Sequence, residues 1–184
     1  GDLDLFVGGR LIPRNYPLPA NSYILENVST KGKPKFIDVT KKIAPELEGL
    51  GMVTSSLWSD FDNDGQIDLI VVGEWMPITV FKNNGGSFKN ITKDLNLGAT
   101  AGWWFSINEG DFDNDGDLDY IVGNLGLNYK YKANKEETFD IYVNDFDKNK
   151  SNDIVLSYYN GGEKFPVRGR ECSSQQIPAI KKKF

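Results

Sequence analysis

Hydrophobic positions in this chain gather in short runs that follow Asp-rich segments. Three of these runs begin with an aspartate and continue as aliphatic residues: Asp68-Leu-Ile-Val, Asp119-Tyr-Ile-Val and Asp153-Ile-Val-Leu. Short apolar runs bounded by polar turn residues are typical of buried strands. The chain opens with a fourth run of the same kind, Asp4-Leu-Phe-Val. We therefore expect that it starts inside a repeat and is a piece of a longer protein.

The residues before each Asp-rich segment also predict strands. Residues 54–58, 104–107 and 139–143 mix aromatic, β-branched and small side chains. Hairpin signals follow at 82–86 and 159–162, where Asn and Gly cluster. Each unit is thus predicted to contain a strand, an Asp loop, a strand, a hairpin and a strand, and units of this size with four short strands are what a β-propeller stacks as blades.

The predicted domain organisation is a single partial β-propeller domain over residues 1–184, an all-β arc of about three to four blades. Residues 124–138 look like an exposed connection. The end of the chain looks helical, because Ser173 or Ser174 could cap a helix, Pro178 suits a first turn, and apolar residues fall on one face. The units are expected at about 1–50, 51–100, 101–138 and 139–170, with a helical tail at 171–184.

The charge of the chain is concentrated in three loops. The net charge is −5, but residues 60–68, 111–119 and 145–153 carry twelve aspartates among them, and the rest of the chain is mildly basic. An acidic chain argues against nucleic-acid binding, and clustered carboxylates are better explained by a cation. Histidine is absent and Cys172 is the only cysteine, which disfavours zinc sites and the common His-dependent catalytic dyads. No apolar stretch is long enough for a membrane helix.

The spacing of the aspartates predicts calcium sites. Calcium takes six to eight oxygen ligands in flexible geometry. Aspartates at loop positions 1, 3, 5 and 9 would supply carboxylates, and the glycine at position 6 lets the backbone turn so that the carbonyl at position 7 can face the ion. The expected ligands are Asp60, Asp62, Asp64, the Gln66 carbonyl and Asp68 in one loop, and Asp111, Asp113, Asp115, the Asp117 carbonyl and Asp119 in another.

Loop 145–153 is a degenerate copy of this motif. Loop 145–153 keeps oxygen donors at Asp145, Asp147, Asn149 and Asp153, but Lys150 replaces the glycine and Lys148 adds positive charge. Two calcium ions are therefore expected and a third is left open. An EF-hand needs a bidentate Glu at position 12. That position is Val71, Val122 and Leu156 in the three loops, so an EF-hand is excluded.

The Asp-x-Asp-x-Asp-Gly-x-x-Asp loop resembles the FG-GAP and VCBS repeats of integrin α-subunit propellers. Segments outside the loops are similar to bacterial repeat proteins related to cartilage acidic protein: Gly8-Gly9-Arg10, residues 35–40, Gly102-Trp103-Trp104, residues 123–128 and Arg168-Gly169-Arg170. The resemblance implies a calcium-bearing propeller, often seven-bladed, of which this chain would be a fragment. It also implies an extracytoplasmic location, whether secreted, periplasmic or at the cell surface.

Two functions remain open from the sequence. The first is a non-catalytic binding or scaffolding module for a protein or polysaccharide ligand. The alternative is part of a calcium-dependent polysaccharide-active enzyme, because some rhamnogalacturonan lyases resemble this family. Trp58, Trp75, Trp103 and Trp104 could offer a sugar-stacking surface, but packing between blades is the interpretation favoured for Trp58 and Trp75. Because Trp103 and Trp104 are adjacent in a strand and face opposite ways, one of them could be exposed.

Overall fold

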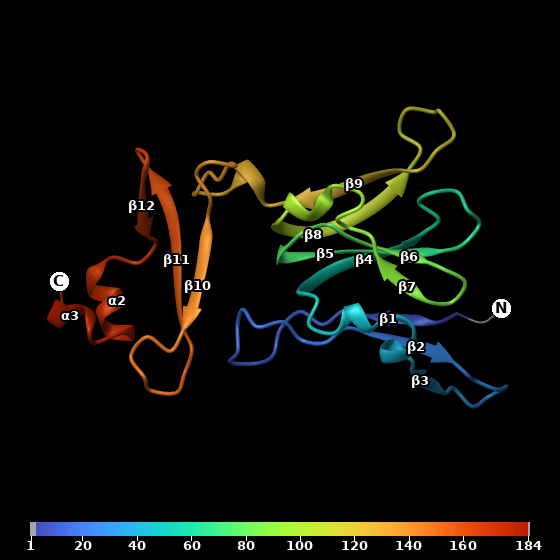
Figure 1. Cartoon of the computed structure of the whole chain (residues 1–184), viewed down its shortest axis with the longest axis horizontal. Helices are drawn as coiled ribbons and strands as arrows, with labels where there is room; N and C mark the ends of the chain where they lie inside the picture. The colour runs from blue at the N-terminus through green and yellow to red at the C-terminus, as the bar shows by residue number, and fades with distance from the viewer. Residues whose placement is uncertain (1–2, 184) are drawn as a thin grey trace. The chain divides into compact units, whose positions relative to one another are not determined.

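The computed structural model describes residues 3–183 and is mostly β (Figure 1). The chain forms two compact units, with the boundary between Leu125 and Gly126. Its strands form three antiparallel sheets, and in the described residues none of them closes into a barrel. None of the helices in that part of the chain has the length and apolar character needed to cross a lipid bilayer.

The first unit contains two of the sheets. The smaller has the strand order β1 (Leu5–Val7), β2 (Tyr23–Asn27) and β3 (Phe36–Asp38). The larger has six strands: β4 (Met52–Ser59), β5 (Asp68–Met76), β6 (Thr79–Asn83), β7 (Phe88–Asn90), β8 (Gly102–Gly110) and β9 (Asp119–Asn124). Strands β4 to β7 pair in sequence order as an antiparallel meander. Strand β8 pairs with the end of β5, and β9 pairs with β8.

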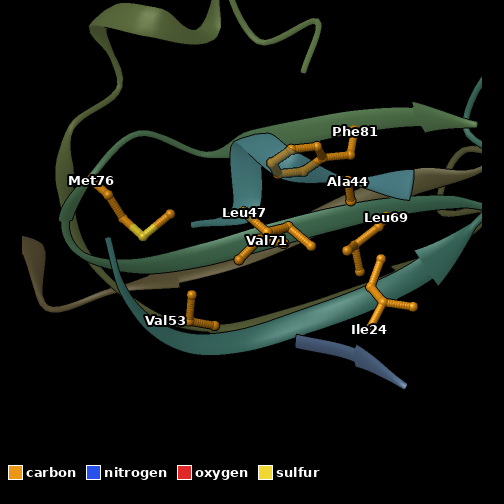
Figure 2. Close-up of a cluster of buried hydrophobic side chains, with 8 residues drawn as sticks. All are labelled: Ile24, Ala44, Leu47, Val53, Leu69, Val71, Met76 and Phe81. Atoms are coloured by element: carbon orange, nitrogen blue, oxygen red, sulfur yellow. The ribbon is translucent and has the colours of Figure 1, made fainter. Parts of the chain in front are cut away.

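Strand β5 is the centre of the larger sheet and is covered on both faces. Leu69 and Val71 enter one buried cluster, whereas Ile70 and Val72 enter another. Figure 2 shows the first cluster, in which side chains from β2, β4, β5 and β6 meet those of the segment after β3. Because alternate side chains of a strand point to opposite faces, only a continuous apolar run can fill both cores. This explains why the segment after Asp68 has no polar alternation.

Short helices that the sequence analysis did not predict cover part of this core. Helix α1 (Thr40–Ile43) and the 3₁₀ helix Pro45–Leu47 follow β3, and Ala44 and Leu47 are completely buried. A further 3₁₀ helix, Leu97–Ala99, precedes β8. Both helices of the first group are a single turn, too short for hydrophobic periodicity to reveal.

The second unit contains one sheet and two helices. Its strands are β10 (Asp140–Asn144), β11 (Asp153–Asn160) and β12 (Glu163–Pro166), paired antiparallel in that order. A 3₁₀ helix at Gly126–Asn128 precedes the sheet, and helices α2 (Arg170–Gln176) and α3 (Ile180–Lys183) follow it. The segment predicted as an exposed connection is only partly so, because Tyr129 and Tyr131 are half-buried and pack against Phe139.

The predicted strands are confirmed: residues 54–58 lie in β4 and residues 104–107 in β8, both with longer bounds, and the segment predicted at 139–143 is β10, shifted by one residue so that Phe139 lies outside it. The strand order predicted for every repeat, with a single strand between the Asp loop and the hairpin, is wrong for the predicted repeat at about 51–100. There the apolar run is divided by a turn at Pro77 and Ile78, so the hairpin at 84–87 joins the third and fourth strands of the meander. The hairpin at 161–162 instead joins β11 to β12.

The predicted C-terminal helix is also different in the structure. It consists of α2 and α3, separated at Ile177–Ala179, with Pro178 in the break. Ser173 and Ser174 do not cap a helix; their hydroxyls donate back to the carbonyls of Arg168 and Arg170. Phe184 lies outside the described residues, as do Gly1 and Asp2.

Candidate metal centre

The three Asp loops occupy equivalent places in the fold. Loop 60–68 joins β4 to β5, loop 111–119 joins β8 to β9, and loop 145–153 joins β10 to β11. Each therefore links two antiparallel neighbours, and its ninth residue is the first residue of the second strand. The strand pairing fixes both ends of each loop, so the aspartates between them are held over a short span.

The aspartate at position 1 organises the backbone of each loop in the same way. One carboxylate oxygen of Asp60 accepts the N–H of Asp64 and the other accepts that of Gly65, at 3.0 and 2.9 Å. Asp111 accepts the equivalent pair of N–H groups at 3.1 Å each. Asp145 does the same with Asn149 and Lys150, at 2.9 and 2.8 Å. The carboxylates are thus fixed by charge-assisted hydrogen bonds before any cation enters.

The residues at positions 5 and 9 also make equivalent hydrogen bonds in all three loops. The side-chain oxygen at position 5 accepts the N–H of position 7 at 2.8–2.9 Å in all three loops. The carboxylate at position 9 accepts the N–H of the phenylalanine at position 2 at 2.9–3.4 Å. Backbone φ is positive at positions 4 and 6 of every loop, as at Asn63 and Gly65. Loop 145–153 therefore has the geometry of the other two, even though lysines occupy its two positive-φ positions.

Three carboxylates converge in each loop. Their nearest oxygens lie within 4.8 Å of one another in the following groups: Asp60, Asp62 and Asp68; Asp111, Asp113 and Asp115; Asp145, Asp147 and Asp153. Two oxygens that bind one calcium ion at about 2.3–2.6 Å can be at most about 5 Å apart. The groups fit this limit, and an oxygen-only donor set suits a hard cation such as calcium.

The remaining predicted ligands lie in the same loops but outside these groups. Asp64 pairs with Lys82, and Asp119 begins β9, where it accepts the N–H of Phe112. Asn149 donates its amide to Asp147 at 3.1 Å. The side chain of Gln66 accepts the N–H of Gly85, and that of Asp117 accepts the amide of Asn63 at 3.2 Å. Loops 60–68 and 111–119 therefore contact each other, while ligation by the Gln66 and Asp117 carbonyls stays a prediction.

Burial distinguishes the ninth residue from the rest. Asp68 is completely buried and Asp153 is 4 % exposed. Burial raises the pKa of Asp68, although the N–H groups of Asn83 and Phe61 act in the opposite direction. The nearby charges of Asp62 and Asp64 raise this pKa further. A carboxylate kept ionised in such a place favours an adjacent positive charge.

One cation beside these loops was missed by the sequence analysis. Lys82, in β6, pairs through Nζ with Asp62 and with Asp64, the latter at 2.9 Å. Hydrogen bonding to both carboxylates raises the pKa of Lys82, and Lys82 in turn lowers the pKa of Asp64. The only sequence signal is that Lys82 precedes the predicted hairpin, and this does not indicate which loop it would reach.

The tryptophans serve mainly as packing groups. Trp58 packs against the rings of Phe6 and Phe88 at centroid distances of 6.5 and 5.6 Å, whereas packing between blades stays a prediction. Trp75 meets Trp103 edge-to-face at 5.0 Å. Trp103 and Trp104 are both half-buried, so the expectation that one of them is exposed is wrong.

Comparison with known families supports part of the predicted resemblance. Residues 60–122 match the family model of the FG-GAP-like repeat. The matched segment begins at the first aspartate of loop 60–68 and includes all of loop 111–119, but it is about a third of the 184 residues. No curated protein matches the chain.

Proposed function

We propose that this chain is a calcium-binding part of an extracytoplasmic β-propeller, and that it acts as a non-catalytic binding or scaffolding module. The observation that carries the proposal is the common geometry of the three loops. Each brings three carboxylates within 4.8 Å, and each fixes its first aspartate with two backbone N–H groups. Such a concentration of negative charge is expected where a divalent cation compensates it.

Calcium suits these loops better than magnesium does. Magnesium demands near-ideal octahedral geometry and keeps several waters, whereas calcium accepts irregular shells with more protein oxygens. The loops offer three carboxylates close together and further oxygens nearby. Asp113, for example, has neighbours on both sides at Asp111 and Asp115. Since loop 145–153 has the same hydrogen bonds, the proposal includes a third ion there.

The propeller assignment is supported by the pairing of β4 to β7. A four-stranded antiparallel meander is the arrangement of a propeller blade, and the FG-GAP-like match begins just after β4 and includes β5, β6 and β7. Strands β1–β3, β8–β9 and β10–β12 would be parts of further blades.

Propeller modules of this kind are typically non-catalytic, and the partner is proposed to be a protein or a polysaccharide. Incubation with pectic polysaccharides should give no unsaturated uronate absorbance; a steady rise would favour a lyase instead.

Calorimetric titration with calcium tests the metal proposal directly. The wild-type chain should bind three ions. Asp62→Ala, Asp113→Ala and Asp147→Ala should each lose one, because each removes a carboxylate from one cluster. Asp94→Ala is the matched control, since it removes an exposed aspartate outside the loops. Absence of saturable binding by the wild-type chain at millimolar calcium would refute the proposal.

The expected affinity bears on location. Each site is formed by one short loop without the bidentate Glu that EF-hands use, so dissociation constants of about 10⁻⁴–10⁻³ M are expected, as in extracellular modules. Sites of this strength fill only where calcium is abundant. Nanomolar constants at all three loops would remove this argument for an extracytoplasmic location.

A further inference from the structure

Loops 60–68 and 111–119 have nearly identical sequences but differ in how their fifth residue is used. In loop 111–119, Asp115 joins Asp111 and Asp113 in the carboxylate group. In loop 60–68 the equivalent Asp64 lies outside the group and pairs with Lys82. The same ammonium also pairs with Asp62, which is a member of the group. One protein cation thus contacts two of the four carboxylates predicted to bind the metal.

The hairpin between β6 and β7 holds Lys82 in this place. The backbone N–H of Asn83 donates to Asp68 at 2.7 Å, and its side-chain amide donates to the Ile67 carbonyl at 3.0 Å. Two residues further on, the N–H of Gly85 donates to Gln66. Lys82 therefore lies in a segment that is hydrogen-bonded directly to the end of loop 60–68.

Lys82 is also partly shielded from solvent. Its side chain is 27 % exposed, and those of Asp62 and Asp64 are 28 % and 29 % exposed. An ion pair of this kind is screened less than a fully exposed one. The ammonium consequently reduces the negative potential that would attract a divalent cation to this loop.

We infer that Lys82 is an internal counter-ion of loop 60–68. Its ammonium stabilises the metal-free loop and makes loop 60–68 the weaker of the two calcium sites in the first unit. This inference depends on the proposed calcium binding. A calcium ion that recruits Asp62 and Asp64 has to displace the ammonium from both. The two loops would then fill at different calcium concentrations in spite of their similar sequences.

The decisive experiment isolates loop 60–68 in an Asp113→Ala/Asp147→Ala background. In this background Lys82→Gln should lower the calcium dissociation constant about tenfold, since a unit charge about 5 Å from a divalent ion is worth that much even in water. Lys82→Arg keeps the charge and should leave the constant within about twofold of the parent. Lys164→Gln is the matched control, because Lys164 pairs at 2.6 Å with Asp140, which belongs to none of the three loops.

Thermal melting supplies a second readout. Lys82→Gln should melt below the wild-type protein in chelator, and the difference should shrink or reverse in saturating calcium. Equal calcium affinity in Lys82→Gln and its parent would overturn the inference while leaving the proposed function intact. A Lys82→Gln chain that stays unfolded in saturating calcium would overturn it too, because calcium would then not replace the ammonium. Failure of the wild-type chain to bind calcium at any loop would instead count against the proposed function.

Discussion

Lys150 shows how a single residue can keep a loop geometry for which it is poorly suited. It stands at position 6 of loop 145–153 with φ of 71°, where the other loops have Gly65 and Gly116 with φ of 83° and 96°. A residue with a Cβ in this left-handed region costs about 1–2 kcal/mol. The hydrogen bonds of Asp145 to the backbone of Asn149 and Lys150 offset this cost.

Replacing Lys150 by glycine should therefore stabilise the second unit. The gain is expected to be about 0.5–1 kcal/mol, because the relief of strain exceeds the entropy that glycine adds to the unfolded chain. Urea denaturation would measure it. Lys135→Gly is the control, since Lys135 is exposed and is not among the residues with positive φ. Equal effects of the two substitutions would contradict the strain argument.

Asp140 leads to a prediction about pH. Burial works against its ionisation, but hydrogen bonds from Lys164 and Thr138 and the charge of Lys164 keep its pKa below the ordinary value. A carboxyl whose folded pKa is lowered adds stability above its unfolded pKa, near 4, and loses this contribution as the pH falls through the folded pKa.

Asp140→Asn should accordingly lower the urea midpoint at neutral pH and have a smaller effect near pH 3. The difference should be modest, under about 1 kcal/mol, because both side chains of the pair are about one-third exposed. Lys164→Gln should show the same pH pattern, since it removes the other half of the pair. A difference from wild type that is the same at both pH values would exclude this origin.

At the scale of elements, a side chain at a β-bulge in β4 bonds to the backbone of β8. The pairing of β4 with β5 shifts between Val53 and Ser55, and Thr54 lies at the shift. Its hydroxyl lies 2.6 Å from the carbonyl oxygen of Trp104 and 3.2 Å from that of Val72. Trp104 itself stands next to a register shift between β8 and β9. One side chain therefore connects three strands where the regular ladder is interrupted.

Thr54→Val should cost about 1–2 kcal/mol of unfolding free energy, because it leaves a partly buried carbonyl without its donor while the side-chain volume is kept. Denaturant unfolding would measure the loss. The same substitution at the exposed Thr30 serves as the control. If both variants lose equally little, the hydroxyl is not what stabilises the bulge.

The elements also show why the sequence predicts some features and not others. The strands flanking each loop were predictable because Asp68, Asp119 and Asp153 mark the change from a polar loop to an apolar run. The turn at Pro77 and Ile78 was not, since it interrupts a run that stays apolar on both sides and periodicity gives no signal there. The pairing of Lys82 with Asp62 depends on where β6 lies beside β5, a tertiary relation that local pattern does not contain.

At the scale of the whole molecule, charge connects the loops to stability. The net charge is −5, and the three proposed calcium ions would bring it to +1. A ligand that binds only the folded state stabilises it by RT ln(1 + [L]/Kd), about 2.7 kcal/mol per site at a hundredfold excess over Kd. Two of the loops lie in the first unit and one in the second, so the proposal predicts that calcium stabilises both units.

The melting temperature, measured in chelator and in excess calcium at constant ionic strength, tests whether calcium stabilises both units. Calcium should raise the melting temperature of the wild-type chain. Asp113→Ala should remove part of the rise in the first unit, and Asp147→Ala should remove the rise in the second. Magnesium at the same concentration should stabilise less, since it loses its water shell reluctantly. Asp94→Ala should respond to calcium as the wild type does. If melting temperatures in chelator and in millimolar calcium were equal, the three loops would be solvated turns, held by the hydrogen bonds of Asp60, Asp111 and Asp145 alone.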